Sequence, residues 1–480
     1  MHSNPVPIPG ATALPSALDP EVCRRARLSR DARFDGEFYL AVRTTGIYCR
    51  PICPARPPAE KNVRYFHSAA QAAQAGFRPC LRCRPESAPN SPAWKGTSTT
   101  VQRALQLLSQ GSLNDGSLTA LARRLGVGER YLRKLFQREL GVSPQALALN
   151  QRLLFAKKLL AETTLPITDV AFAAGFGSVR RFNSAVQQQF RLTPRALRGR
   201  GNAGNSSVSI QLQLHYRPPY DWEGVADFFM RHAVAGVEAV TMHSYRRNIL
   251  LAGVAGSFEV RPVVGKNALH LILQLSDYSR LMTVVARVRR MFDLDANPAA
   301  IAEVLSEDAR LATLLSQFPG IRAPGHWSLY EASLRAIVGQ QISTQAARGV
   351  LARLAHAASA TAQFLHFPSA AGIAALADEQ FPMPGKRRET VRALCGLCNA
   401  SGDELALDAL AALPGVGPWT TAMVAMRGSG LPDTFPNRDL GLEKAWARLP
   451  DTALPLQQQT ACWRPWRSYA ANLLWRSLSL

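Results

Sequence analysis

Two closely spaced pairs of cysteines constrain the N-terminal part of this chain more than any other feature. Cys49 and Cys53 are separated by three residues, Cys80 and Cys83 by two, and 26 residues lie between the pairs. Pairs of this spacing, joined by a compact loop, allow four thiolates to converge tetrahedrally on one Zn²⁺ ion. By itself the spacing favours a structural zinc site. Zinc also deprotonates its thiol ligands, so the same sulfurs are candidate nucleophiles at neutral pH.

The chain is long and strongly basic. Its 480 residues suggest about three or four domains, and 56 Lys and Arg against 34 Asp and Glu give a formal net charge of +22. Such a charge favours a polyanionic partner, with nucleic acid as the first expectation. The eight cysteines occur mostly as pairs, which fits metal binding better than a disulfide scaffold. Because no apolar run long enough to span a membrane and no secretion signal occur, we expect a cytoplasmic protein without a membrane partner.

Changes in residue pattern divide the chain into modules. Linker-like stretches rich in Ser, Pro, Gly and Asn occur at 87–99 and 199–207. Between the two linkers the pattern is helical. After the second linker it becomes strand-like with intervening helices, and from about residue 297 it is helical again. Residues 1–20 are rich in Pro and Ala and are predicted to form a loose leader. The predicted fold class is a multidomain α+β protein with a zinc-binding module (21–88), an all-α module (97–200), an α+β module (208–296) and a second all-α module (297–480).

Residues 35–86 resemble the N-terminal domain of the Ada family of methylphosphotriester-DNA methyltransferases, with both cysteine spacings intact. The resemblance implies one Zn²⁺ bound by Cys49, Cys53, Cys80 and Cys83, and it implies that Cys49 accepts a methyl group irreversibly from a methylated DNA phosphate. A methylphosphotriester is neutral, so an electron-rich thiolate approaches it without charge repulsion. Methylation lowers the formal charge of such a site from about −2 to about −1, which favours DNA binding.

Arginines beside the first cysteine pair are candidate phosphate contacts. Arg43, Arg50 and Arg56 lie close to that pair in sequence, although solvated surface arginines are an equally good interpretation. His67 lies between the two pairs, and we expect a structural role for it because four sulfurs already complete the site.

An internal repeat occupies the second module. Residues 118–144 and 167–194 align with an offset of 49 to 50 residues. In each copy an amphipathic helix ends at a glycine, Gly126 or Gly175, and a basic helix follows. Glycine permits the left-handed turn that joins the two helices of a helix-turn-helix.

The two copies, joined by a helix over 146–162, resemble the DNA-binding domain of the AraC family. The resemblance places recognition helices at about 129–138 and 178–188. Base contacts and phosphate contacts cannot be separated at this stage. The candidate DNA-contacting residues are Arg130, Arg133, Lys134, Arg180, Arg181 and Asn183.

Residues 413–428, LPGVGPWTTAMVAMRG, have the form of a helix-hairpin-helix. Gly415 and Gly417 allow positive φ and leave backbone amides free to bind a DNA phosphate. By itself this motif indicates non-specific DNA binding. Asp439 follows the turn by about twenty residues, which is the order of turn and carboxylate typical of base-excision glycosylases.

From residue 208 to the C-terminus the chain resembles the AlkA family of 3-methyladenine DNA glycosylases. The resemblance implies that Asp439 is the catalytic carboxylate, which stabilises positive charge on the sugar while water attacks. It also implies that Trp419 and Trp475 form the walls of a pocket for the flipped-out base. Core packing is the alternative role for both tryptophans.

Three positions refine the expected chemistry. Gln341 occupies the place of a leucine that wedges into the DNA stack in the AlkA family, so its wedge role is open. Met423 replaces a pocket tyrosine, which affects the expected substrate range more than the reaction. The branch of the superfamily that also cleaves the strand has a lysine in the hairpin, where this chain has Trp419, so we expect base removal without lyase chemistry.

The remaining cysteines do not indicate a second metal site. Cys395 and Cys398 form a C-x2-C without a second pair, so we expect them to pack within a helix. Only Cys462 follows Asp439, so no iron–sulfur cluster is expected.

Together the modules predict a bifunctional alkylation-response protein: a stoichiometric methyl acceptor and transcriptional activator that also acts as a hydrolase of the DNA-3-methyladenine glycosylase type. The expected partners are double-stranded DNA and RNA polymerase, with the chain acting as a monomer. One alternative is a transcription regulator with structural zinc and an inactive glycosylase-like domain. Another is a repair enzyme whose helical repeats bind DNA non-specifically. No Pro-Cys-His-Arg sequence occurs, so repair of O6-methylguanine is not predicted.

Overall fold

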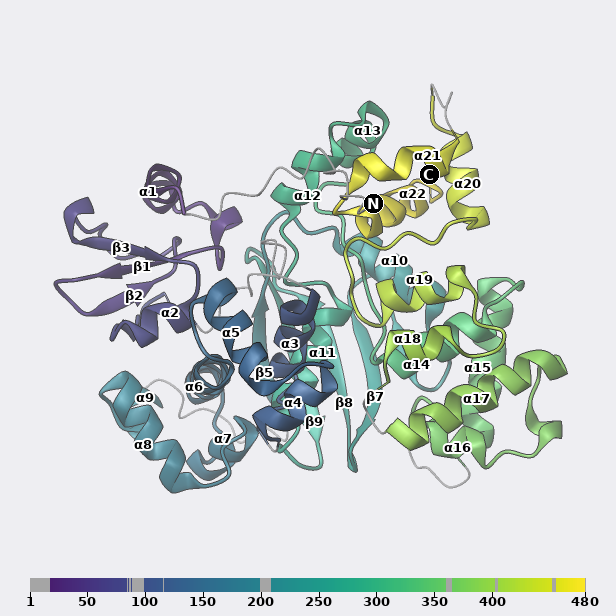
Figure 1. The fold of residues 1–480 in the computed structure, drawn as a ribbon, viewed down its shortest axis with the longest axis horizontal. Helices are drawn as coiled ribbons and strands as arrows, with labels where there is room; N and C mark the ends of the chain where they lie inside the picture. Colours follow the sequence, from purple (N-terminus) through teal and green to yellow (C-terminus); the bar gives the residue numbers. More distant parts are fainter. Residues whose placement is uncertain are drawn as a thin grey trace, which may run out of the picture. The chain divides into compact units, whose positions relative to one another are not determined.

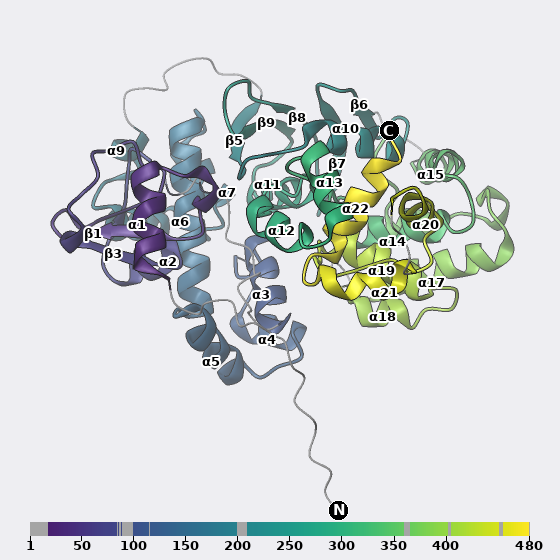
Figure 2. The same cartoon turned by 90° about the horizontal axis from the view of Figure 1, so that it is seen from above.

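The chain forms two compact units (Figure 1, Figure 2). The first comprises Met1–Phe155 and Asn183–Thr193, and the second comprises Ala156–Phe182 and Pro194–Leu480. The computed structural model describes residues 18–83, 85, 88, 99–114, 116–198, 209–359, 365–401, 405–450 and 455–479. Residues 1–17 of the predicted leader therefore lie outside the described part.

The N-terminal region is built on a small sheet. Its strands pair in the order β3-β1-β2-β4, with β4 parallel to β2 and the other pairs antiparallel. Because side chains alternate along a strand, Tyr39 and Ala41 pack with helix α2 while Leu40 and Val42 pack with the cysteines. The elements are α1 (Pro20–Ser29), η1 (Ala32–Phe34), β1 (Tyr39–Val42), β2 (Ile47–Cys49), η2 (Glu60–Asn62), β3 (Val63–Phe66), α2 (Ala69–Gln74) and β4 (Arg78–Pro79).

The repeat region is helical, as predicted. Gly126 and Gly175 have φ values of 69° and 80°, so both copies turn through the left-handed conformation that their glycines permit. Leu121, Leu132 and Phe136 are buried between the helices of the first copy. The helices are α3 (Thr99–Ser109), α4 (Leu118–Arg124), α5 (Glu129–Leu140), α6 (Pro144–Glu162), α7 (Ile167–Ala173), α8 (Val179–Phe190) and α9 (Pro194–Arg198).

The α+β region contains a second, antiparallel sheet with the strand order β5-β9-β8-β7-β6. Its alternating sequence buries every second residue of β5, as at Ile210, Leu212 and Leu214. Phe229 of α10 contacts Tyr245 of β7, with ring centroids 4.6 Å apart, so α10 packs on this sheet. The elements are β5 (Ile210–His215), α10 (Trp222–His232), β6 (Glu238–Val240), β7 (Tyr245–Leu251), β8 (Val254–Pro262), β9 (Ala268–Leu275) and α11 (Leu281–Met291).

The C-terminal region is helical, and Figure 1 shows its helices in two groups, one with α14 to α19 and the other with α12, α13 and α20 to α22. Leu334, Leu354 and Leu394 belong to the core of the first group. The elements are α12 (Pro298–Leu305), α13 (Ala309–Gln317), α14 (Leu329–Val338), α15 (Thr344–Ala358), α16 (Ala370–Ala374), η4 (Asp378–Gln380), α17 (Gly385–Ser401), α18 (Leu407–Ala411), α19 (Pro418–Arg427), α20 (Leu440–Ala447), α21 (Leu456–Gln459), η5 (Thr460–Trp463) and α22 (Arg467–Ser477).

A buried ionic network ties α14 to the antiparallel sheet. Arg247 of β7 donates to both carboxylate oxygens of Glu331 on α14. Arg335, one turn further along α14, donates to Glu331 and to Glu238 of β6 at 2.9 and 2.7 Å. Buried charges need such paired partners. The network therefore fixes the helix that leads into the turn at Gln341.

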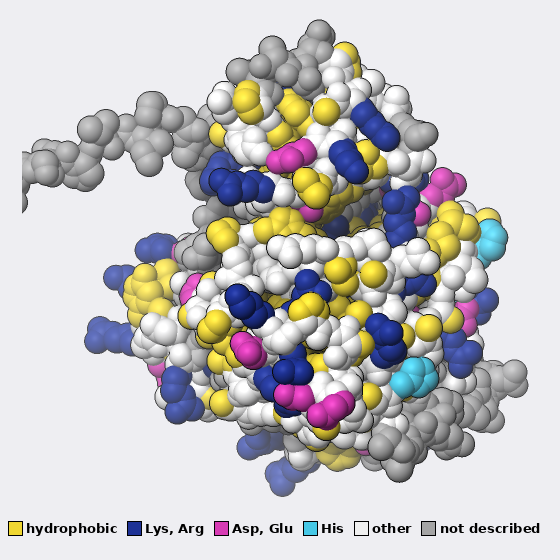
Figure 3. All heavy atoms as spheres, turned by 90° about the vertical axis from the view of Figure 1, so that its right-hand side faces the viewer, with side chains coloured by type: hydrophobic (Ala, Val, Ile, Leu, Met, Phe, Trp, Pro, Cys, Tyr) yellow, Lys and Arg dark blue, Asp and Glu magenta, His cyan; other side chains and the backbone are white. Residues whose placement is uncertain are grey.

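On the face of the second unit shown in Figure 3, Lys and Arg side chains are spread among hydrophobic and uncharged polar surface. The positive charge is thus distributed over this face rather than gathered in one patch. Within the described ranges, none of the helices combines the length and the apolar character needed to cross a lipid bilayer.

Candidate functional site

Four cysteine side chains converge beside the N-terminal sheet. The Sγ atoms of Cys49, Cys53, Cys80 and Cys83 all lie within 4.8 Å of one another. Cys49 ends β2 and Cys80 follows β4, and the parallel pairing of these two strands brings the two cysteines together. A tetrahedral site with Zn–S distances of about 2.3 Å needs sulfurs roughly 3.8 Å apart. The predicted ligand set is therefore assembled in one place.

The surroundings of the sulfurs fit a divalent cation. Backbone N–H groups donate to Sγ of Cys83 at 3.3 Å and to Sγ of Cys80 at 3.4 Å, which stabilises thiolate charge. Hydrogen bonding with Cys53, Cys80 and Cys83 raises the pKa of Cys49, whereas hydrogen bonding with Cys49 lowers the pKa of Cys80. Four thiols whose sulfurs lie within 4.8 Å of one another cannot all hold negative charge without a cation, and Zn²⁺ would supply that cation. The residues present fit one Zn²⁺ ion.

Arg50 supports the cysteine cluster from inside. Its side chain is only 4% exposed. The guanidinium donates to both carboxylate oxygens of buried Asp35, with Nε to Oδ1 at 2.8 Å, and Nη1 donates to the backbone oxygen of Cys83 at 3.1 Å. The prediction that Arg50 contacts a DNA phosphate is therefore wrong, because buried partners occupy its donors.

The other candidate residues near the cysteine cluster are either exposed arginines or do not belong to the cluster. Arg43 and Arg56 are exposed, and their contact with phosphate stays a prediction. His67 does not belong to the group of four metal-binding side chains.

The candidate DNA-contacting residues of the two recognition helices are exposed. On α5 these are Arg130, Arg133 and Lys134, and Tyr131 beside them is 53% exposed, a large side chain that sequence reasoning missed. Arg133 pairs with Glu129 one turn away at 2.6 Å. The corresponding exposed residues of α8 are Arg180, Arg181 and Asn183.

The hairpin between α18 and α19 depends on one glycine more than on the other. Gly415 has φ 83°, and a Cβ there would lie 2.3 Å from Oγ1 of Thr390. Gly417 has φ −96° and precedes α19 as its N-cap, and a Cβ there would meet nothing within 4 Å. The expectation of positive φ is confirmed for Gly415 and wrong for Gly417. Gly417 instead leaves the amide end of α19 uncovered, which suits an approaching phosphate.

Asp439 lies where the two groups of C-terminal helices meet. It caps α20, and its Oδ1 accepts from the backbone N–H of Leu442 at 3.0 Å. The indole Nε1 of Trp475, on α22, also donates to Oδ1 at 3.0 Å, and Nε1 of Trp419, on α19, donates to Oδ2 at 3.0 Å. Three N–H donors from three helices therefore fix one carboxylate in position.

The two tryptophans have a role that the sequence did not indicate. They were predicted as walls of a base pocket, and the structure shows that the edge of each indole holds Asp439. Both side chains are half-buried, so the predicted stacking role stays open beside this one.

Two further residues at this site were missed. A Cβ added at Gly441 would lie 3.0 Å from Asp439 Oδ1 and 3.2 Å from the Trp475 ring, so a larger residue would press on this contact. Arg427 is buried with its guanidinium carbon 5.2 Å from the centre of the Trp475 ring, and burial lowers the pKa of Arg427 to about 9. Arg427 lies at the end of the helix-hairpin-helix segment and Gly441 two residues after Asp439, but their contacts with Trp475 and Asp439 become visible only in the folded structure.

The turn between α14 and α15 is bonded to the hairpin. Nε2 of Gln340 donates to the backbone oxygen of Gly415 and to Oγ1 of Thr420, both at 2.9 Å. Gln341 follows with an exposed side chain and φ 58°, a left-handed backbone. Met423 is partly buried against the core of α14 to α19.

The other cysteine prediction is confirmed. Cys395 and Cys398 are buried in the core on α17. Cys462 is exposed.

Three family models match parts of the chain. The metal binding domain of Ada matches residues 22–86, a helix-turn-helix domain matches 121–200, and the AlkA N-terminal domain matches 211–328.

Related proteins match the same regions. DNA-3-methyladenine glycosylase 2 of Escherichia coli is 31% identical over 55% of this chain and 95% of its own length. The bifunctional transcriptional activator/DNA repair enzyme Ada of Escherichia coli is 34% identical over 36% of this chain and 48% of its own length. A probable bifunctional transcriptional activator/DNA repair enzyme AlkA of Mycobacterium tuberculosis is 41% identical over 96% of this chain and 97% of its own length. With a four-cysteine cluster, a repeated helix-turn-helix and a glycosylase fold in one polypeptide, the chain belongs to the family of Ada–AlkA fusion proteins, the bifunctional transcriptional activators and DNA repair enzymes.

Proposed function

We propose that the C-terminal half removes alkylated purines of the 3-methyladenine class from DNA by hydrolysing the N-glycosidic bond. The observation that carries this proposal is the Asp439 carboxylate, which two indole N–H groups and one backbone N–H fix beside the hairpin. A carboxylate held under a sugar ring stabilises the positive charge that develops as the bond breaks. A relative named for this activity covers the same part of the chain.

The reaction requires the target nucleotide to leave the helical stack so that its sugar reaches Asp439. The glycosidic bond then breaks with its electron pair on the purine. A water oxygen forms the new bond to the sugar carbon, and the carboxylate takes a proton from that water. The three hydrogen bonds to Asp439 limit its rotation, so the carboxylate meets the developing charge without first reorganising.

Alkylated purines suit this site for an electronic reason. N-alkylation makes the base cationic and a good leaving group, and aromatic ring faces attract cations. Trp419 and Trp475 are half-buried, and the edge of each indole holds Asp439. Because Trp419 stands where a lysine would be needed for Schiff-base chemistry, we propose hydrolysis without strand cleavage.

For the N-terminal half, we propose that Cys49 Sγ accepts the methyl group of a DNA methylphosphotriester. A sulfur–carbon bond forms, the methyl carbon–oxygen bond breaks, and its electron pair stays on the phosphate oxygen. Bound Zn²⁺ supplies deprotonation of the four thiols. Backbone N–H groups donate to the sulfurs of Cys80 and Cys83, which disperses negative charge on those two ligands. The thioether product does not release the methyl group, so each chain reacts once.

The repeated helix-turn-helix is proposed to convert this chemistry into transcriptional activation. Methylation removes one negative charge near bound DNA, which strengthens attraction to phosphates. Recognition helices α5 and α8 present exposed basic residues for promoter binding. We further propose RNA polymerase as the protein partner, a monomeric chain, and the four-domain division at 21–88, 97–200, 208–296 and 297–480.

An excision assay tests the glycosylase proposal. Methylated duplex DNA is incubated with wild type, Asp439→Asn and, as a matched control on exposed α18, Asp408→Asn. Wild type and D408N should release 3-methyladenine, whereas D439N should lose release by at least about 100-fold, because one catalytic carboxylate is removed. No release by wild type would favour a regulator with an inactive glycosylase-like domain.

Promoter binding tests the regulatory proposal. Affinity for promoter DNA is measured before and after the protein reacts with methylphosphotriester DNA. The proposal expects a rise in affinity that Cys49→Ser abolishes. Unchanged affinity after confirmed methylation would instead indicate a repair enzyme with non-specific DNA-binding repeats.

A further inference from the structure

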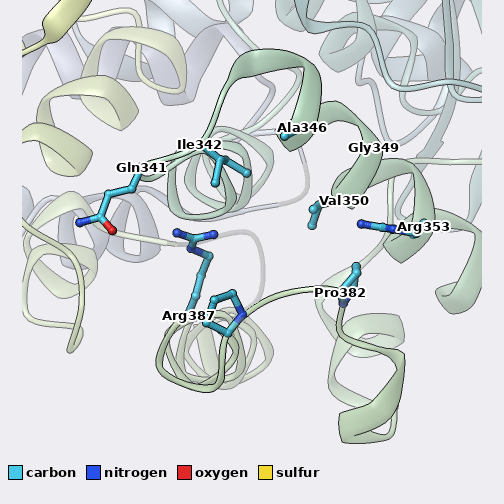
Figure 4. A pocket seen from close by; sticks show the side chains of 9 residues that line it. Gln341, Ile342, Ala346, Gly349, Val350, Arg353, Pro382 and Arg387 are labelled. Carbon is cyan, nitrogen blue, oxygen red and sulfur yellow. The ribbon is translucent and has the colours of Figure 1, made fainter.

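A pocket beside Gln341 is not used by the catalytic site. It has a volume of about 780 Å³ and is formed by the α14–α15 turn, helix α15, the segment before α17, and α17 itself. Figure 4 shows the Arg387 side chain reaching from α17 toward Ile342 at the turn, with Arg353 on α15 across the pocket. Catalytic Asp439 and its two tryptophans do not line it.

The pocket lining combines apolar surface with positive charge. Ile342, Val350 and Pro382 supply apolar surface, Arg353 and Arg387 supply two guanidinium groups, and no lining residue is acidic. A nucleotide matches this combination, because it has flat apolar faces, hydrogen-bond acceptors on its base edge and an anionic phosphate. A cationic or purely apolar ligand matches it poorly.

Hydrogen bonds connect the pocket to the DNA-binding hairpin. Arg387 Nη2 donates to the backbone oxygen of Gln340 at 2.6 Å. The Gln340 side chain in turn donates to Gly415 and Thr420 of the hairpin at 2.9 Å. Thr420 adjoins Trp419, whose indole holds Asp439. Arg387 of the pocket lining is therefore linked through Gln340 to the hairpin that adjoins Asp439.

The turn at Gln341 separates two binding regions. On one side, Gln340 is bonded to the hairpin that leads to Asp439. On the other side, Ile342 lines the pocket. Gln341 also lines the pocket, and it is exposed with its backbone in the left-handed conformation. A nucleotide drawn toward Asp439 leaves its former pairing partner unpaired in the opposite strand.

We propose that this pocket binds the unpaired nucleotide opposite the excised base, with Arg353 and Arg387 contacting its base edge or phosphate. The proposal rests on the proposed glycosylase function, which supplies the flipped-out base. It adds a second recognition site, so that binding depends on what remains in the opposite strand. A bound pairing partner is also hindered from re-entering the stack, which keeps the damaged nucleotide extruded.

Equilibrium binding of the full chain tests this proposal. Two duplexes carry a stable abasic analogue in one strand, and opposite it one carries a normal nucleotide and the other a second abasic analogue. Wild type should bind the first duplex about tenfold more tightly. Arg353→Met, which removes an exposed charge, and Gly349→Trp, which fills the pocket, should reduce this preference to within about twofold.

The chain offers a matched control. Gly349 and Gly396 are both exposed helical glycines whose added Cβ would meet nothing within 4 Å, so the two positions are matched for substitution by tryptophan. Gly396 does not line the pocket, so Gly396→Trp should keep the full preference. Equal loss of affinity for both duplexes in R353M, or an unchanged preference in G349W, would overturn the proposal and indicate a different occupant.

A separate readout distinguishes the two proposals. If wild type excises 3-methyladenine but shows no preference between the two abasic duplexes, the pocket proposal fails alone. If wild type shows the preference but excises nothing, the glycosylase proposal fails while the pocket remains a nucleotide-binding site.

Discussion

At the scale of single residues, Asp439 is held by donors that differ in origin. One is the backbone N–H of its own helix, and the other two are indoles from α19 and α22. The positions of the two indoles depend on the packing of both helix groups. The position of the Asp439 carboxylate therefore depends on the same packing. Catalysis that relies on such a prepositioned charge loses rate when the donors are removed.

The indole N–H donors can be removed while an aromatic ring is kept at each position. Trp475→Phe or Trp419→Phe deletes one N–H bond to a charged oxygen, a loss of about 1.5–3 kcal/mol. We therefore expect the single-turnover excision rate to fall about ten- to a hundredfold, with little change in the affinity for damaged DNA. Excision at the wild-type rate by both variants would show that the indoles serve only as packing.

The buried ion pair of Arg50 gives a second prediction for a single residue, which concerns stability and zinc retention. Arg50→Met leaves the buried carboxylate of Asp35 without its partner, and breaking a buried pair costs about 3–5 kcal/mol. The variant should unfold at lower denaturant concentration and release zinc to a chelator faster than wild type. Arg56→Met, at an exposed position in the same region, is the control and should change neither property. Identical behaviour of the two variants would contradict the supporting role of Arg50.

Residue identity alone predicted some of these features and missed others. The spacing of the four cysteines was sufficient to predict the zinc ligands, because short-spaced pairs leave few ways to arrange four thiolates around a metal. The role of Arg50 was missed because its partner Asp35 precedes it by 15 residues and follows no motif. The bonds of Trp419 and Trp475 to Asp439 were missed for the same reason, since they join three helices that only the fold brings together.

At the scale of elements, the hairpin glycines should respond differently to substitution. Gly415→Ala places a Cβ against Thr390 in a left-handed backbone and should destabilise the protein by about 1–3 kcal/mol. Gly417→Ala meets no obstacle within the protein, so its stability should stay within about 0.5 kcal/mol of wild type while its DNA affinity falls. Denaturant unfolding and DNA binding measure the two effects. A stable G415A variant would contradict the structural role of that turn.

We expect the stability of the second unit to depend on pH through Asp293, which follows α11. Asp293 accepts from the backbone N–H of Ala323 and from the hydroxyl of Tyr469, and burial raises its pKa to about 7. In the unfolded chain its pKa is about 3.9. Between these values the unfolded state binds fewer protons, so this group's contribution to stability is full below about pH 4 and is lost as pH rises to about 7.

Asp293→Asn should therefore remove that decline. The free energy of unfolding is measured between about pH 4 and 7 for wild type, D293N and the exposed control D408N. The difference between D293N and wild type should grow with pH, whereas D408N should follow wild type. Parallel curves for wild type and D293N would show that Asp293 does not titrate in this range.

Element positions were predicted well where sequence periodicity was strong. The left-handed turns at Gly126 and Gly175 and the alternating burial of β5 followed directly from residue pattern. Gly417 shows the limit of such reasoning, because a glycine in a turn motif need not use positive φ. The hydrogen bonds of Gln340 to the hairpin were also beyond prediction, since 75 and 80 residues separate the partners.

At the scale of the whole molecule, two alkylation chemistries occupy separate places. The cysteine cluster lies in the first compact unit and Asp439 in the second. In the proposed function, the first site is used up when it accepts a methyl group, and the second turns over by hydrolysis. The two activities should therefore be separable by single substitutions that leave the rest of the chain folded.

The measurement that tests this account most directly follows both products in one reaction. Wild type, Cys49→Ser and Asp439→Asn are each incubated with methylated DNA, released bases are separated by chromatography, and the proteins are mapped by mass spectrometry. Wild type should release 3-methyladenine and carry one methyl group, on Cys49. C49S should release the base without becoming methylated, and D439N should become methylated without releasing the base. A methyl group on another cysteine of wild type, or base release by D439N at the wild-type rate, would contradict the account.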